Sequence, residues 1–192
     1  AIGVEPSINV ANESRKYGVK TINEFFSEKL ADKISSEIGN ANVIYAANVF
    51  CHIPNINDLA KACSSLLKDG GVLIFEDPYL GDVLEKNSFD QIYDEHVFLF
   101  SCHAVQAIFM TYGLTLFDCK KINTHGGSVR YYLSKNSTKK PTLNLNSQLD
   151  YEIKIGLLDM NCYSTFSEKC NYVKNEFKKQ LLSHKSAGNK IL

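Results

Sequence analysis

Short apolar runs recur along the first half of the chain, and longer mixed segments separate them. Four of these runs have the length and β-branched content of buried strands, at residues 2–5, 19–22, 42–47 and 72–75. A helix is predicted after the first run, because the Pro6-Ser7 pair favours a helix start and Gly18 favours a helix end. Apolar residues at the helical period predict another helix over residues 56–67, before Gly70-Gly71. Strands that alternate with helices predict an α/β fold with a doubly wound (Rossmann-like), mostly parallel sheet.

The alternation loosens after Glu76. Residues 80–86 and 101–112 are predicted helices, and residues 114–121 and 128–133 are predicted strands that can pair antiparallel at the sheet edge.

The last third of the chain has a different pattern. Residues 135–141 are polar and linker-like, so we place a domain boundary there. Beyond it, apolar residues from Leu149 to Leu181 recur every three or four positions or at multiples of that, which predicts one long amphipathic helix. We therefore expect a core domain at residues 1–134, followed at 135–192 by a linker and a helix leading into a C-terminal domain. Residues 1–5 and 189–192 resemble strands that are cut, which suggests a fragment.

Composition narrows the possible partners. Apolar residues make up 44% of the 192, enough for one sizeable core. Basic and acidic residues both number 21, so no basic surface predicts nucleic acid or anionic lipid as a partner. No apolar run approaches the roughly 18 residues that a membrane span needs, and no secretory signal opens the chain. We expect a cytoplasmic protein that is a monomer or a weak oligomer.

The six cysteines predict no metal site. They are scattered, without a C-x-x-C pair or paired Cys/His spacing of the kind that zinc sites use. Buried small apolar residues are the simplest interpretation of such cysteines. Cys51, next to His52, is the only one that suggests chemistry.

Polar residues follow two of the predicted strands. Ligands of doubly wound sheets bind outside the carboxyl ends of the strands. Glu5 stands at such a place and could accept both hydroxyls of a ribose, and Asn48 and His52 follow a later strand. An isolated glutamate can equally be a surface residue, and an isolated histidine a cap or core residue.

The densest polar cluster is Gln91-Ile92-Tyr93-Asp94-Glu95-His96. Its phenol, carboxylates and imidazole suit proton transfer, since an imidazole titrates near neutral pH and a carboxylate can orient it. A solvated polar turn is the alternative. The loop His125-Gly126-Gly127-Ser128 with Arg130 suits an oxyanion, although a plain glycine turn would look the same.

Five segments together resemble one family, the S-adenosylmethionine-dependent sugar C-methyltransferases, such as the deoxysugar C-3 methyltransferases. They are Gly3-Val4-Glu5-Pro6-Ser7, ANVIYAANVFCHIP at 41–54, FEDPYLGD at 75–82, SFDQIYDEHVFLFS at 88–101 and HGGSVR at 125–130. The resemblance covers roughly residues 2–133. It implies a class I methyltransferase core between an N-terminal zinc-binding domain, absent here, and a C-terminal Rossmann-like domain. It also implies a glycine-rich strand ahead of Ala1, so we expect a sheet that is incomplete at its N-terminus and weak cofactor binding by this chain.

The same resemblance implies roles for individual residues. The substrate would be a nucleotide-linked keto deoxysugar that is deprotonated next to its ketone and then methylated on that carbon. The implied catalytic residues are His96 as base, Glu95 as its orienting group or a sugar contact, and Tyr93 and His52 at the ketone and enolate oxygen. The implied ligands of S-adenosylmethionine are Glu5 and Pro6 at the ribose, Phe25 or Phe26 at the adenine, and Asn48 at the methionine end. The residues expected to face the substrate are Asp77, Tyr79, His125 and Arg130. No metal is expected in this chain, and zinc only in the absent domain.

Two other functions are compatible with the same pattern. A nicotinamide-dependent sugar oxidoreductase or epimerase would share the sheet and the acid after an early strand. A non-catalytic protein with a degenerate methyltransferase fold could dock a partner through the long helix. Retention of Tyr93, Glu95 and His96 together favours an enzyme.

Overall fold

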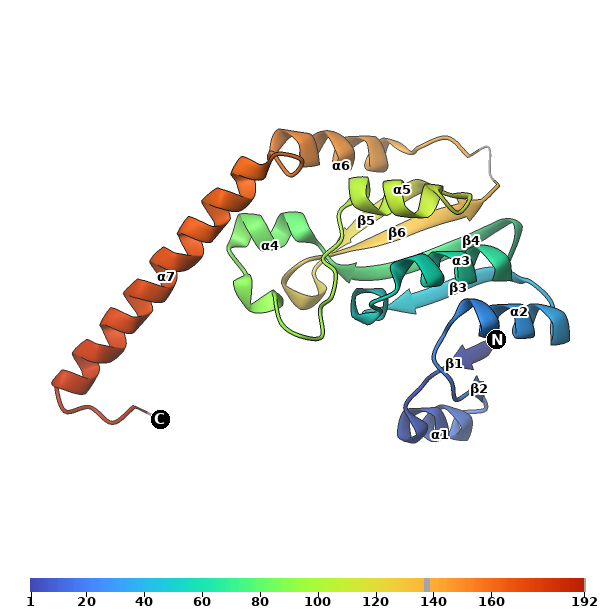
Figure 1. Ribbon diagram of the computed structural model, residues 1–192, viewed down its shortest axis with the longest axis horizontal. Coiled ribbons are helices and arrows are strands. Elements are labelled where there is room, and N and C mark those ends of the chain that lie inside the picture. Colours follow the sequence, from blue (N-terminus) through green and yellow to red (C-terminus); the bar gives the residue numbers. More distant parts are fainter. Residues whose placement is uncertain (137–138, 192) are drawn as a thin grey trace.

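The computed structural model describes residues 1–136 and 139–191 (Figure 1). Within these residues the chain forms strands, α-helices and three 3-10 turns in alternation. In chain order they are β1 (Ile2–Val4), α1 (Ile8–Lys16), β2 (Lys20–Ile22), α2 (Glu28–Glu37), β3 (Ala41–Ala47), η1 (Phe50–His52), α3 (Ile56–Leu66), β4 (Leu67–Pro78), α4 (Leu80–Lys86), η2 (Phe89–Gln91), α5 (Cys102–Met110), β5 (Leu114–Ile122), η3 (Thr124–Gly126), β6 (Ser128–Lys135), α6 (Leu143–Lys154) and α7 (Met160–Ser186). None of the described helices is both long and apolar enough to cross a bilayer.

The strands form two sheets. β1 and β2 pair in parallel beside α1, and the other four strands follow the order β3-β4-β6-β5. β3 is parallel to β4, whereas β6 runs antiparallel to both β4 and β5, as predicted for the last two strands. In the larger sheet, therefore, β3, β4 and β5 share one direction and β6 runs in the opposite one.

A cleft separates β1 from β3. It has a volume of about 630 Å³ and is lined by the facing edge of β3, by Val4 of β1 and by Phe26. Within the described chain β3 pairs with β4 alone, so Val43 and Tyr45 remain 55% and 59% exposed. The sheet is thus open on this side, which confirms the expectation of an incomplete sheet.

The core lies between the larger sheet and the helices that pack on it. Phe75 of β4 is fully buried, and its ring contacts those of Phe50, Phe100, Phe109 and Tyr131. Aromatic residues from separate segments thus converge on one strand, and each such pair adds to the stabilisation from buried area.

Five of the described α-helices begin at side-chain caps, and α2, α3 and α5 are among them. Ser27, Asn55 and Ser101 accept hydrogen bonds from the main-chain N–H groups of Leu30, Asp58 and Ala104. α2, which begins after Ser27, is absent from the sequence predictions. Its buried residues Leu30, Ala31 and Ile34 pack against α3 and show the spacing of an amphipathic helix, so the signal was present.

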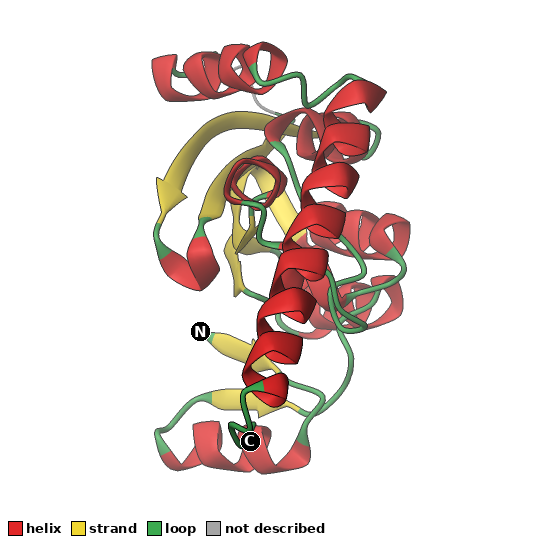
Figure 2. Cartoon of the chain, turned by 90° about the vertical axis from the view of Figure 1, so that its left-hand side faces the viewer, coloured by secondary structure: helices red, strands yellow, loops and turns green. Residues whose placement is uncertain are grey.

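The long helix predicted from Leu149 to Leu181 is wrong, because the chain forms two helices there. Gly156 adopts a left-handed conformation (φ 73°) after α6, and Asp159 caps the start of α7 by accepting from the N–H of Asn161. Between them lies the buried residue Leu157. α7 has no buried residue and projects from the body of the molecule in Figure 1, and it lies in front of the body in the view of Figure 2.

The C-terminal end of the chain also differs from the prediction, whereas the predicted strand at 2–5 is present as β1. Residues 189–191 form no strand, so the predicted strand at 189–192 is wrong for these residues, and Leu192 lies outside the described part of the chain. Of the predicted linker at 135–141, Lys135 still belongs to β6, and residues 137 and 138 lie outside the described part.

Candidate functional site

The carboxyl ends of β3 and β4 bring together residues from separate segments. After β3, Asn48 takes a left-handed conformation (φ 53°) and donates its N–H to the carbonyl of Glu76 at 2.7 Å. The chain then turns through η1, which carries Cys51 and His52. The loop after η2 returns over this turn, because the N–H of Phe98 donates to the carbonyl of Cys51.

This return places two histidines side by side. The rings of His52 and His96 are stacked with their centroids 5.1 Å apart. The Nδ1 atom of His52 lies 2.7 Å from the carbonyl oxygen of Glu95, and that of His96 lies 2.8 Å from the carbonyl oxygen of Gln91. A carbonyl only accepts, so each ring in its neutral form carries its proton on Nδ1. The Nε2 atoms are therefore the unprotonated nitrogens of the neutral rings.

Tyr93 completes this group. Its hydroxyl lies 3.1 Å from Nε2 of His96, and the two rings are in contact. Since Nε2 of His96 carries no proton, the phenol is the donor. The predicted cluster at 91–96 thus forms a connected unit of phenol and imidazole.

Of the two roles expected for Glu95, that of orienting His96 is filled by another residue. In the described structure the main-chain carbonyl of Glu95 holds His52, while the carbonyl of Gln91 accepts from the His96 ring. The orientation of His96 therefore comes from Gln91. No side-chain signal in the sequence could have indicated it, because the contact uses main-chain oxygen.

Beneath the histidines lie two fully buried groups, Cys51 and Asp77. Burial raises the pKa of Asp77 to about 6, while neighbouring Cys51 and His52 oppose that shift. Burial and the nearby Asp77 carboxylate raise the pKa of the Cys51 thiol. Within the described chain neither oxygen of Asp77 has a well-formed hydrogen bond.

The expected cofactor residues lie on both sides of the cleft. Glu5 follows β1, and its Oε1 atom accepts from the N–H of Ser7 at 2.7 Å. The carbonyl of exposed Pro6 accepts from the side-chain amide of Asn23. Phe26 lines the cleft, whereas Phe25 is 80% exposed, so the structure favours Phe26 for a pocket role. On the other side Asn48 has a buried Oδ1 atom without a partner in the described chain.

The residues expected to face the substrate separate into different environments. Asp77 lies beneath the histidines, and Arg130 pairs with Glu76 at 2.6 Å, which raises the pKa of its guanidinium. Glu76 directly follows the strand predicted at 72–75, as Glu5 follows an early strand, and could have been singled out from the sequence. His125 lies on an exposed turn in a left-handed conformation (φ 50°).

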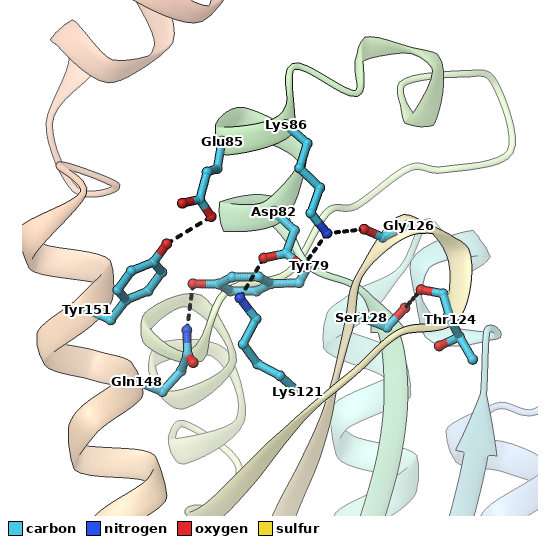
Figure 3. A network of polar contacts seen from close by, with 10 residues as sticks. All are labelled: Tyr79, Asp82, Glu85, Lys86, Lys121, Thr124, Gly126, Ser128, Gln148 and Tyr151. Atoms are coloured by element: carbon cyan, nitrogen blue, oxygen red, sulfur yellow. Dashed lines mark hydrogen bonds and ion pairs between the residues drawn. The ribbon is translucent and has the colours of Figure 1, made fainter.

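Tyr79 does not face an open surface. It is fully buried, its hydroxyl accepts from the amide of Gln148, and burial raises its pKa. Figure 3 shows it within a polar network that links α4, the β5–β6 loop and α6. In this network Asp82 binds Lys121 at 2.6 Å and Lys86 at 3.1 Å, and Tyr151 donates to Glu85. Tyr79 is therefore part of the packing between these elements.

Family models match nearly the whole chain. A methyltransferase domain covers residues 1–118, and a C-methyltransferase C-terminal domain covers residues 123–192. The chain belongs to the S-adenosylmethionine-dependent methyltransferases, in the family that carries this C-methyltransferase C-terminal domain. The oxidoreductase alternative is thereby set aside.

Individual relatives agree with this assignment. C-methyltransferase NovU of Streptomyces niveus is 34% identical over 128 residues, which are 67% of this chain and 30% of that protein. The chain therefore spans about a third of that relative's length.

Solved structures share the fold. A methyltransferase of Thermotoga maritima described as S-adenosylmethionine-dependent and as a possible histamine N-methyltransferase is 20% identical, with a TM-score of 0.52 over 70% of this chain and 72% of that chain. Another S-adenosylmethionine-dependent methyltransferase, from Anabaena variabilis, is 17% identical, with a TM-score of 0.53 over 70% and 67%. These likenesses confirm the class I methyltransferase fold.

Proposed function

We propose that this protein methylates a carbon atom next to the ketone of a nucleotide-linked keto deoxysugar, with S-adenosylmethionine as methyl donor. The observation that carries the proposal is the His52–His96 pair at the carboxyl ends of β3 and β4. Two imidazoles with Nδ1 held by main-chain carbonyls present unprotonated Nε2 atoms at the place where α/β sheets bind ligands. Because the chain belongs to a C-methyltransferase family, we infer that this base acts in the methylation of a carbon atom.

His96 is the proposed base. A C–H bond beside a ketone is acidic enough for removal once the enolate oxygen is stabilised. Nε2 of His96 would take the proton, and Nδ1 would stay bonded to the Gln91 carbonyl, which favours the imidazolium formed. Because that carbonyl belongs to the main chain, the ring keeps its orientation through the reaction.

Tyr93 and His52 would then differ in role. The Tyr93 hydroxyl is a donor already next to His96, so it can turn from Nε2 to the enolate oxygen. Neutral His52 offers an acceptor at Nε2, because its proton is on Nδ1. We therefore assign the oxygen contact to Tyr93 and a sugar hydroxyl to His52, with Glu95 beside the sugar.

The residues present fit S-adenosylmethionine. The buried Oδ1 of Asn48 lacks a partner in the described chain and can accept from an ammonium group, while Phe26 offers an apolar wall. Glu5 keeps one carboxylate oxygen outside its bond to Ser7 for a ribose hydroxyl. When bound, the cofactor supplies an electrophilic methyl group, so these side chains need only position it. His125 and Arg130, near the β5–β6 loop, remain candidates for the nucleotide part of the substrate.

Proton exchange tests the proposal directly. In the whole protein, His96→Ala should slow deuterium exchange at the carbon beside the ketone by about 10²-fold or more, and methyl transfer with it. Exchange is followed by mass spectrometry of a panel of keto-sugar nucleotides in heavy water. His184→Ala, on exposed α7, is the matched control and should exchange as the wild type does. Wild-type exchange in His96→Ala would remove His96 as the base, and a wild type that transfers no methyl group would favour a degenerate fold.

A further inference from the structure

The residues beneath and around the histidine pair suit a second kind of ligand. The sulfur of Cys51 and one ring nitrogen from each of His52 and His96 lie within 4.8 Å of one another. One thiolate and two imidazoles are a donor set that borderline-soft divalent ions such as Zn²⁺ prefer. We propose that Cys51, His52 and His96 form a binding site for Zn²⁺ or a similar divalent transition-metal ion.

The surroundings of both rings support this site. Metal-binding histidines almost always donate their other N–H to a carbonyl or carboxylate, which fixes the tautomer and aims the free nitrogen. Here Nδ1 of His52 donates to the carbonyl of Glu95, and Nδ1 of His96 donates to that of Gln91. Both carbonyls come from one short segment, residues 91–95, so the conformation of this segment prepares both ligands.

The carboxylate of Asp77 also supports a cation site next to Cys51. Asp77 is fully buried beside Cys51, and in the described chain it pairs with no lysine or arginine. A divalent cation on the Cys51 sulfur would supply the positive charge that this carboxylate lacks. On binding, the thiol releases its proton to solvent, and the two neutral histidines give up none.

Three protein ligands leave one tetrahedral position open. Cys51 forms the buried floor, whereas His52 and His96 are partly exposed, so the ion would enter from the solvent side. The hydroxyl of Tyr93, 3.1 Å from Nε2 of His96, lies next to the position that the ion would take. A water molecule or this phenol could complete the coordination.

The site stands on this geometry alone and does not depend on the proposed reaction. If that reaction also holds, the ion would occupy the Nε2 atom that serves as base, so Zn²⁺ would inhibit proton exchange. Metal binding is measured without cofactor or sugar, which keeps the two proposals separable.

Cobalt provides a visible probe. Titration of this chain with Co²⁺ under a non-thiol reductant should give one equivalent of bound metal, with ligand-field bands of low coordination number and a thiolate-to-cobalt charge-transfer band. Cys51→Ser should abolish the charge-transfer band, and His52→Ala and His96→Ala should each lower affinity at least about tenfold. His184→Ala and Cys162→Ser, both on α7, are the matched controls and should bind as the wild type does.

Two outcomes would overturn the proposed site. One is that no cobalt spectrum appears at excess metal. The other is that the three site variants keep their metal binding while the controls lose it. Circular dichroism checks that each variant folds. Should Cys51→Ser unfold, histidine nitrogen resonances of the unaltered chain decide, since Zn²⁺ must shift Nε2 of His52 and His96 and leave His184 unchanged. Unshifted site resonances would refute the proposal.

Discussion

At the scale of single residues, Asp77 is a carboxyl group whose charged form the fold disfavours. It is fully buried and, in the described structure, pairs with no lysine or arginine, so burial raises its pKa from 3.8 to about 6. The folded state therefore holds a proton that the unfolded chain has already released between these pH values. Folding stability must then fall as the pH rises through this window.

Asp77→Asn should remove this dependence. For the wild type, we expect the free energy of unfolding to fall by about 3 kcal/mol from this group between about pH 4 and pH 7. The variant should lack that fall, because its amide does not titrate. Urea unfolding at a series of pH values, with a chelator present, measures the difference. Exposed Asp94→Asn is the control and should follow the wild type; parallel curves for wild type and Asp77→Asn would contradict the assignment.

At the scale of elements, the β5–β6 loop is held by packing as well as by turn geometry. Gly127 has a φ of 137°, and its carbonyl accepts from the N–H of Tyr79. A Cβ atom there would lie 1.9 Å from Oδ2 of Asp82, the carboxylate that binds Lys86 and Lys121. Gly126 also has a positive φ, 79°, but its Cβ would meet open space.

The two glycines therefore make a matched pair. Gly126→Ala should cost about 1 kcal/mol, the usual cost of a left-handed alanine. Gly127→Ala should cost about 3 kcal/mol or more, because backbone strain adds to the clash with Asp82. Chemical denaturation of both variants gives the comparison. Equal losses would show that Asp82 moves aside freely and that the loop is not clamped to α4.

At the scale of the whole molecule, the expected cofactor residues belong to two separate sheets. Glu5 follows β1 of the small sheet, and Asn48 follows β3 of the large one, with the cleft between them. In the described chain no strand bridges β1 and β3. Cofactor affinity should therefore depend on both sheets keeping their relative position.

Glu5→Gln tests the contribution of the small sheet. In the whole protein, the dissociation constant for S-adenosylmethionine should rise about tenfold or more, since a charge-assisted bond to ribose is replaced by a neutral one. Calorimetric titration measures it. Glu13→Gln, an exposed acid on neighbouring α1, should leave affinity unchanged. An unchanged constant in Glu5→Gln would refute the ribose role.

The local pattern of the sequence was enough to predict most elements and the polar cluster at 91–96. Helix α4 and the antiparallel β5–β6 pair were predicted because period, caps and turn residues act over a few positions. The break at Gly156 was missed because the helical period continues through it, whereas the burial of Leu157 depends on distant contacts.

Only the tertiary structure decided which polar residues meet. His52 and His96 come from different segments, and the atoms that orient them are main-chain carbonyls, which carry no residue-type signal. For the same reason Cys51 joins them without any ligand spacing in the sequence. Tyr79, whose motif suggests a substrate contact, is instead covered by Gln148 of α6. Residue type thus determined which chemical groups are available, and long-range packing determined the neighbours of each group and its exposure to solvent.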